Sequence, residues 1–216
     1  MIILKTFDVQ GFEPAIHGMR NPKNSWAKSD SQWGCNGDSC PIDGFELGPN
    51  DRQLALQLAG AGPVHGKFRR MITVWVDITA PLYWWKEFDT YKVGTVANSC
   101  STMHKIHEKP FSFGDFSHEH LSGTAEVALE HVIDILNLNR DLFNASGHKD
   151  KESWWQMIQL LPSSYNQTRT VQLNYEVLAN ICEYRANHKL DEWHDFIKWA
   201  KTLPYPELFL GGGHNE

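Results

Sequence analysis

Positive charge is scarce in this sequence. Lys and Arg number 20 against 26 Asp and Glu, so the formal net charge is -6. A protein that neutralises many backbone phosphates needs clustered Lys and Arg, so the charge balance argues against broad binding to DNA or RNA. A small anionic ligand remains compatible with this balance, because a few local cations can bind it within an acidic protein.

Long apolar runs are also missing. No stretch approaches the roughly 20 residues that span a bilayer, and the first ten residues lack the basic and apolar regions of a signal peptide. We therefore expect a soluble, cytoplasmic protein with no membrane partner. The 216 residues, 41% of them hydrophobic, have an ordinary globular composition. We expect a single domain covering residues 1–216.

Cysteine is sparse, with four in the chain. Only Cys35 and Cys40, in "CNGDSC", are close in sequence, and their spacing is not C-x-x-C. A metal site would need two further ligands, which His17 or His65 could supply only if the fold brought them close. We interpret the pair as reduced thiols in a surface loop, and we predict no metal site.

Hydrophobic periodicity predicts two strands and mostly helices, an α/β or α+β fold. Residues 21–49 are rich in Gly, Ser, Asn and Asp, which indicates a long surface insertion of the kind that often has a function. Asn50 and Asp191 are the expected N-caps of two helices. The expected strands cover residues 1–9 and 69–78, and the expected helices cover residues 13–21, 50–62, 80–91, 124–143, 151–162, 171–185 and 191–204.

Two buried faces are expected from these patterns. In the central strand, Ile72, Val74, Val76 and Ile78 alternate with polar or larger residues. In the helix over residues 124–143, the apolar stripe is Val127, Val132, Ile133 and Leu136. The doublets Trp84–Trp85 and Trp154–Trp155 are interpreted mainly as packing residues.

The segment "YKVGTVANSCSTM", residues 91–103, is crowded with small hydrogen-bonding side chains but contains one cation, Lys92. Such composition after an apolar segment is typical of a ligand-contacting loop. Asn98 and Ser101 could instead satisfy backbone groups in a turn. The candidate ligand-contacting residues here are Lys92, Asn98, Ser99, Ser101 and His104, with Lys105 as a further cation.

The same segment resembles the R-H-R-x-x-S-x-N-x-x-S-x-R motif of the flavin-dependent thymidylate synthases. Aligned without gaps from Tyr91, the motif's Asn falls on Asn98 and its second Ser on Ser101. The other motif positions carry different residues: the arginines fall on Tyr91, Val93 and Met103, the His on Lys92, and the first Ser on Val96.

Other segments resemble the family in the same order along nearly the whole chain. "GMRNP" around Arg20 is similar to its "AAR" turn, and "VHGKF" around His65 to its H-x-S segment. Residues 161–185 resemble its LP…T…N-x-R-x-L…R run, and "DEWHDFIKWA" its closing A-Q-W-E-I helix. Within residues 161–185, Glu176 replaces an Arg of the family. Ahead of the central strand, Arg69 and Arg70 stand where the family has Glu-His.

The resemblance implies the family's fold, a central mixed sheet with flanking helices, and a homotetramer whose pockets are built from several subunits. It implies that Arg185 contacts a nucleotide phosphate and that Lys92, Asn98, Ser99, Ser101 and His104 are nucleotide-binding residues, with Lys105 as a further cation for the phosphate. If flavin is bound, Asn174 and Tyr91 would contact it. Trp84 and Trp85 could stack on a base, an interaction of roughly 1–3 kcal/mol.

The missing arginines change the expected function. Each hydrogen bond to a charged group is worth about 1.5–3 kcal/mol, and about 1.4 kcal/mol is a tenfold change in affinity. We therefore expect a non-catalytic nucleotide-binding protein without a cofactor, which captures a nucleotide-derived signal as a phage or mobile-element sponge. The alternatives are a flavin-dependent C5 methyl or hydroxymethyl transferase that binds FAD, and a purely structural interaction protein.

Overall fold

The computed structural model describes residues 1–34 and 44–210, so Cys35 and Cys40 lie outside the described residues. The contacts within the chain group its residues into two compact units. The first unit consists of Met1–Ile3, Ile78–Thr90 and Asn98–Thr170. The second consists of Leu4–Asp77, Tyr91–Ala97 and Val171–Glu216.

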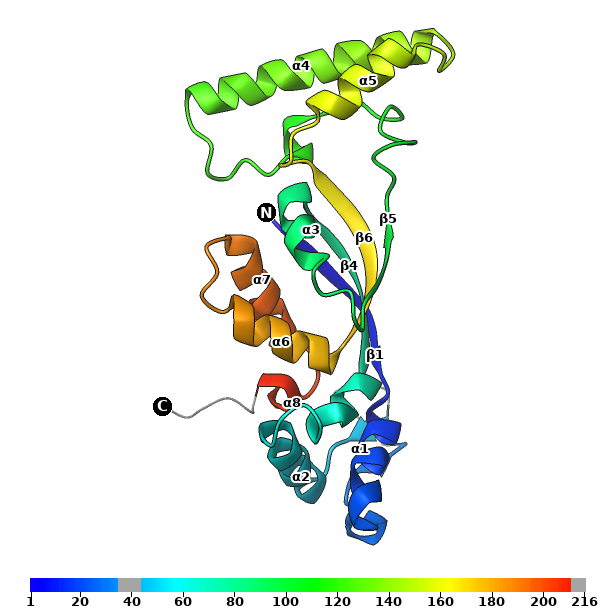
Figure 1. The fold of residues 1–216 in the computed structure, drawn as a ribbon, viewed down its shortest axis with the longest axis vertical. Helices are drawn as coiled ribbons and strands as arrows, with labels where there is room; N and C mark the ends of the chain where they lie inside the picture. The colour runs from blue at the N-terminus through cyan, green and yellow to red at the C-terminus, as the bar shows by residue number, and fades with distance from the viewer. Residues whose placement is uncertain (35–43, 211–216) are drawn as a thin grey trace. The chain divides into compact units, whose positions relative to one another are not determined.

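Four strands form the main sheet in the order β1-β4-β6-β5, and each contributes residues to both units (Figure 1). The predicted alternation of β4 is confirmed, because Ile72, Val74, Val76 and Ile78 are all 0% exposed. The strands are β1 (Ile3–Gln10), β4 (Thr73–Pro81), β5 (Val96–Ser99) and β6 (Asn166–Asn174).

The sequence did not predict β5 and β6. β5 lies inside the segment that was expected to be a loop, and β6 runs to Asn174, where a helix was expected. In β6 the buried Val171 and Leu173 alternate with exposed Gln172, which is the period-2 pattern of a strand. Likewise Thr79 and Pro81, expected to open a helix, end β4, and α3 (Leu82–Phe88) follows them.

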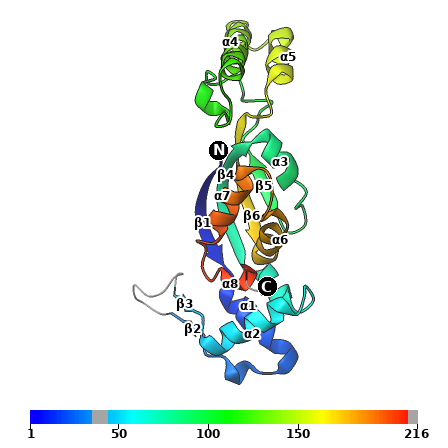
Figure 2. The ribbon, with the colours of Figure 1, turned by 90° about the vertical axis from the view of Figure 1, so that its left-hand side faces the viewer.

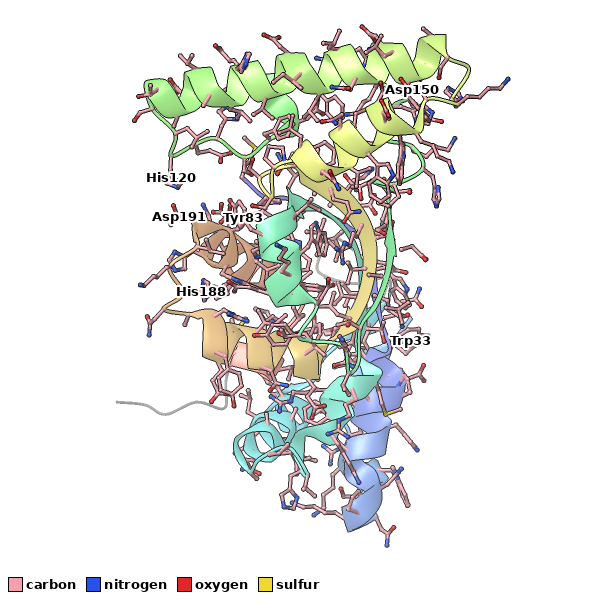
Figure 3. The ribbon with its side chains drawn as sticks, turned by 45° about the horizontal axis from the view of Figure 1, so that its top comes forward. Trp33, Tyr83, His120, Asp150, His188 and Asp191 are labelled. Atoms are coloured by element: carbon pink, nitrogen blue, oxygen red, sulfur yellow. The ribbon has the colours of Figure 1, made fainter. Side chains whose placement is uncertain are left out.

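The first unit has its own apolar core beneath two neighbouring helices, α4 (Thr124–Ala145) and α5 (Lys151–Leu160), which lie side by side in Figures 1 and 2. Val127 was expected on the buried stripe of α4 but is 62% exposed, because the first buried position is Leu129, two residues later and on the opposite side of the helix. Asp150 caps α5 and accepts hydrogen bonds from two of its amides (Figure 3). The core residues are Ile106, Phe111, Phe116, Leu129, Ile133, Leu136, Phe143 and Met157.

In the second unit, helices α6 (Tyr175–Arg185) and α7 (Asp191–Ala200) lie on one side of β4 and β6 in Figures 1 and 2. Leu178, Ile181, Trp193 and Phe196 are all 0% exposed. Asp191 is the first residue of α7 rather than its cap, which is Leu190. The short α8 (Glu207–Leu210) follows.

The inserted segment of the second unit contains local structure. After α1 (Phe12–Arg20), the 3-10 helices η1 (Asn21–Lys23) and η2 (Trp26–Lys28) lead to a small antiparallel pair, β2 (Gln32–Trp33) and β3 (Phe45–Glu46), shown in Figure 2. Helix α2 (Pro49–Gly60) follows, capped by Gly48 instead of Asn50, because Pro49 occupies its first position. Among the described residues, no helix is both long and apolar enough to cross a membrane.

Candidate functional site

Arg185 ends α6 with its guanidinium beside two aromatic rings of the second unit. Its Nε donates a hydrogen bond to the Tyr91 hydroxyl at 3.0 Å. The guanidinium carbon lies 4.9 Å from the ring centroid of Trp193 and 5.6 Å from that of Tyr91. Because a guanidinium is planar, these contacts fix the direction of its donors, a requirement for recognising a phosphate or carboxylate.

Asn174 caps the opposite end of the same helix. Its Oδ1 accepts hydrogen bonds from the amides of Glu176 at 3.1 Å and Val177 at 3.0 Å. Gly94 approaches this cap closely: its φ is +87°, and a Cβ there would lie 2.9 Å from the Asn174 Nδ2. The segment from Tyr91 to Gly94 therefore contacts both ends of α6: Tyr91 contacts Arg185 at one end and Gly94 approaches Asn174 at the other.

We expect Asn174→Ala to lower the free energy of unfolding by about 1 kcal/mol, since the helix loses its cap. Urea denaturation followed by circular dichroism measures this change. Asn180→Ala is the matched control, because Asn180 is exposed in the interior of the same helix and Ala is the better helix former. Equal effects of the two substitutions would contradict the capping role.

An ion pair between Arg70 and Glu176 lies beside this region. Arg70, in the 3-10 helix η3 (Gly66–Met71), donates from Nε to the Glu176 carboxylate, and this hydrogen bond raises the pKa of Arg70. The family resemblance expects His at the first position and Arg at the second. The cation of this pair is therefore on η3 rather than on α6; Arg70 is exposed, whereas the neighbouring Arg69 is buried and donates to the Gly66 carbonyl at 3.2 Å.

The other predicted binding residues, apart from Lys92, belong to the first unit. Asn98 and Ser99 are exposed on β5, which is an edge strand of the sheet. Ser101 Oγ accepts hydrogen bonds from the amides of Met103 at 3.3 Å and His104 at 2.9 Å. Ser101 therefore supports a turn, the structural role that the sequence left open. His104 and Lys92 are exposed, each in its own unit.

Trp84 and Trp85 are core residues, which corrects the prediction that they stack on a base. They are 0% and 1% exposed, and their rings pack edge-to-face at 5.0 Å. The Trp85 Nε1 donates to the Gln167 carbonyl at 2.9 Å. Because these rings are already covered by the protein, the structure assigns them to packing.

Arg169 organises a hydrogen-bond chain that the sequence did not reveal. Its guanidinium stacks on Trp85, with 4.2 Å between the guanidinium carbon and the ring centroid. It donates to Asp89 at 2.7 Å and to the Gln167 Oε1 at 3.0 Å. Gln167 then donates to the Cys100 carbonyl at 2.7 Å. This chain holds the segment that contains Asn98 and Ser101 against β6 of the same unit.

We expect Arg169→Lys to lower the free energy of unfolding by about 1.5 kcal/mol, because an ammonium cannot stack flat and make both hydrogen bonds. Hydrogen exchange of the Cys100 amide, which donates to the Thr168 carbonyl at 2.9 Å, should become faster. Arg140→Lys is the control, since Arg140 pairs with the exposed Asp141. Unchanged exchange at Cys100 would contradict the positioning role of Arg169.

The described residues include no cluster of three or more His, Cys, Asp or Glu side chains that could hold a metal ion. They also fit a flavin poorly. Where the resemblance expects arginines, Val93 is 92% exposed, Met103 is 43% exposed, and the Tyr91 hydroxyl accepts from Arg185. The Oδ1 of Asn174, a position where the resemblance implies a flavin contact, is occupied by the helix cap.

Comparisons with known proteins agree on the fold. No family model and no curated sequence matches the chain. The structure of thymidylate synthase X from Helicobacter pylori with FAD and dUMP is 17% identical, covers 99% of this chain and 100% of that one, and has a TM-score of 0.67. The UMP/dUMP methylase PolB from Streptomyces cacaoi, bound with 5-Br dUMP, is 13% identical, covers 100% and 98%, and has a TM-score of 0.64. The chain therefore has the fold of the flavin-dependent thymidylate synthases.

Proposed function

We propose that this protein binds a pyrimidine nucleotide and does not catalyse flavin chemistry. The observation that carries the proposal is the oriented guanidinium of Arg185, at the position where the resemblance implies a phosphate contact. A charge-assisted hydrogen bond from Arg to phosphate is among the strong kinds. Lys92, which belongs to the same unit, is the further cation of this site, while Asn98, Ser99, Ser101, His104 and Lys105 of the first unit stay predictions from the sequence.

The structural neighbours support a nucleotide as the ligand. The Helicobacter pylori structure contains dUMP, and those of the Streptomyces cacaoi methylase contain 5-Br dUMP or 5-Br UMP. All three align with at least 95% of both chains. A fold that holds uridine nucleotides in two differently named enzymes is a reasonable scaffold for the same ligand class here.

The loss of flavin contacts supports a binding role over a catalytic one. Two guanidinium positions have become apolar, at Val93 and Met103, and a third has become acidic, at Glu176. Each lost charged hydrogen bond is worth about 1.5–3 kcal/mol, so the loss of several would weaken ligand binding at the family's site by orders of magnitude. Capture of a nucleotide-derived signal, as by a phage sponge, is the role that such a site suits.

The second candidate is a flavin-dependent transferase that acts at C5 of a pyrimidine nucleotide. The similar structures favour this candidate, because one is a thymidylate synthase and the other a UMP/dUMP methylase. If FAD is bound, Asn174 and Tyr91 are the residues expected to hold it.

Two measurements on the purified protein separate the candidates. The binder should be colourless, take up no added FAD and be stabilised by dUMP or UMP; a ligand at 100 times its Kd adds about 2.7 kcal/mol. The enzyme should show flavin absorbance and oxidise a nicotinamide cofactor. No stabilisation by any nucleotide would contradict both and favour a structural protein. A mass spectrum of the small molecule that co-purifies would identify the ligand.

We also propose that the protein works as a homotetramer, as the resemblance implies. All four residues of β5 are exposed, and the apolar Val96 on it is 61% exposed. Val93, ahead of the strand, is 92% exposed. An edge strand with apolar side chains is a surface that another subunit can cover. Light scattering coupled to gel filtration should give four times the mass of the chain, and a monomer would contradict the proposal.

A further inference from the structure

A second candidate site lies in the second unit, where the inserted segment meets α1. It is a cavity of about 170 Å³, smaller than the roughly 300–1,000 Å³ of sites for drug-sized ligands. It can therefore hold a compact group rather than a whole nucleotide. The lining residues that carry the argument are Glu13, His17, Arg20, Trp26, Trp33 and Phe45.

Trp26 forms one aromatic side of the cavity. Its indole stacks on the His17 ring, with 6.1 Å between centroids and 19° between planes. The Trp26 Nε1 donates to the Asn21 Oδ1 at 2.8 Å. Trp26 is nevertheless 44% exposed. This indole is thus held in one orientation while part of its surface stays open.

A second aromatic side is formed by Trp33 of β2, and Figure 3 shows the labelled Trp33 beside α1. Trp33 is 62% exposed, and its ring lies 6.0 Å from that of Phe45 on the paired strand β3. Phe45 is buried and stacks on Phe12 at 5.6 Å. The Tyr205 hydroxyl donates to the Phe45 carbonyl at 3.2 Å. The exposed indole of Trp33 therefore packs against Phe45, a residue of the buried core.

The charges around the cavity leave a negative balance. The Arg20 Nε donates to the Asp51 Oδ1 at 2.5 Å, and these two side chains are 4% and 0% exposed. Asp51 thus neutralises Arg20, and it also accepts from the hydroxyls of Ser29 and Ser31. Glu13 is exposed on α1 and has no ion-pair partner among the described residues. The carboxylate of Glu13 is the remaining charge at the cavity.

We propose that this cavity binds an alkylated ammonium group. Indole faces attract such cations through the ring quadrupole, and several aromatic rings around one cavity are the arrangement used for quaternary ammonium ligands. Glu13 adds a direct charge attraction, while the neutralised Arg20 removes the main repulsion. The cation can come from a small molecule such as choline or from a trimethylated lysine side chain. This site does not depend on the nucleotide site.

Calorimetric titration of the full chain tests the proposal with matched probes. Choline and its neutral isostere 3,3-dimethylbutan-1-ol have the same shape and differ in charge. We expect choline to bind at least about tenfold more tightly. Trimethyl-lysine is the third probe, and the tighter of the two cations identifies the source. Equal binding of choline and the neutral isostere, or no binding of either cation, would overturn the proposal.

Substitutions locate the site. Trp33→Ala and Glu13→Gln should each weaken binding of the preferred cation about tenfold. Trp155→Ala and Glu126→Gln are the controls, since both residues are exposed on helices of the first unit, and they should change nothing. Because Trp33 and Glu13 are exposed, the circular dichroism spectra should stay native. Arg185→Ala should leave cation binding intact, so failure of either proposed site is distinguishable from failure of the other.

Discussion

Asp51→Asn is expected to lower the free energy of unfolding by about 3–5 kcal/mol, because it leaves the guanidinium of Arg20 buried without its counter-ion. Asp51 is 0% exposed. Besides Arg20, it accepts from Ser29 Oγ at 2.6 Å, Ser31 Oγ at 2.7 Å and the Ser31 amide at 3.0 Å. The NH₂ group of an asparagine is itself a donor, so it could not accept the hydrogen bonds that one of the Asp51 oxygens accepts.

Urea denaturation measures this loss. Glu108→Gln is the control, since Glu108 pairs with Lys105 where both side chains are more than half exposed, and such pairs contribute at most about 1 kcal/mol. A loss of less than about 1 kcal/mol for Asp51→Asn would show that the ion pair contributes little to the packing of α1 against α2.

The same carboxylate should make stability depend on acid. Burial raises the pKa of Asp51, but the hydrogen bonds from Ser29, Ser31 and Arg20 together outweigh it, and the pKa lies below the ordinary value of 3.8. A lowered folded-state pKa means that the contribution is complete above 3.8 and is lost as the pH falls through the folded value. Asp51→Asn should remove this part of the acid dependence, and an unchanged pH profile would contradict the assignment.

Arg185→Ala is expected to weaken nucleotide binding by about tenfold to a hundredfold while the fold stays intact. The loss corresponds to about 1.5–3 kcal/mol, the value of one hydrogen bond to a charged group. The effect should appear in calorimetry with dUMP. Arg52→Ala is the control, because this substitution removes the same charge from the same unit. Arg52 forms a partly exposed ion pair with Glu207.

The outcome that would contradict the role of Arg185 is unchanged affinity for dUMP. The side chain would then serve only to pack against Tyr91 and Trp193. Tyr91→Phe refines the test, because it keeps the ring and removes the hydroxyl that accepts from Arg185 Nε. We expect a smaller loss of affinity than for Arg185→Ala, since the guanidinium remains but is less firmly oriented.

Local patterns predicted the elements whose apolar residues are dense and regular. The alternation of Ile72, Val74, Val76 and Ile78 was enough for β4, and part of the buried face of α4 was visible in Ile133 and Leu136. β6 was missed because its first half, "NQTRT", is polar, so that Val171 and Leu173 were assigned to the following helix. The two-residue strands β2 and β3 are too short to produce a pattern.

Tertiary features were beyond the reach of local patterns. Arg20 and Asp51 are 31 residues apart in sequence, and nothing local predicts their pairing. The approach of Tyr91 and Gly94 to the two ends of α6 depends on how the chain crosses between strands. The assignment of Tyr91, Asn174 and Arg185 as binding residues came from the collinear resemblance and not from any local pattern. For Trp84 and Trp85, the composition could not distinguish a core doublet from a stacking platform.

Calorimetry of the flavin-free protein, titrated first with dUMP and then with FAD, tests most directly whether a uridine nucleotide is held here without its flavin partner. We predict that dUMP binds by itself, that FAD then gives no heat of binding, and that a reversed order of addition changes neither result. Heat from dUMP only after FAD has bound would show a working flavin site, and it would contradict the account.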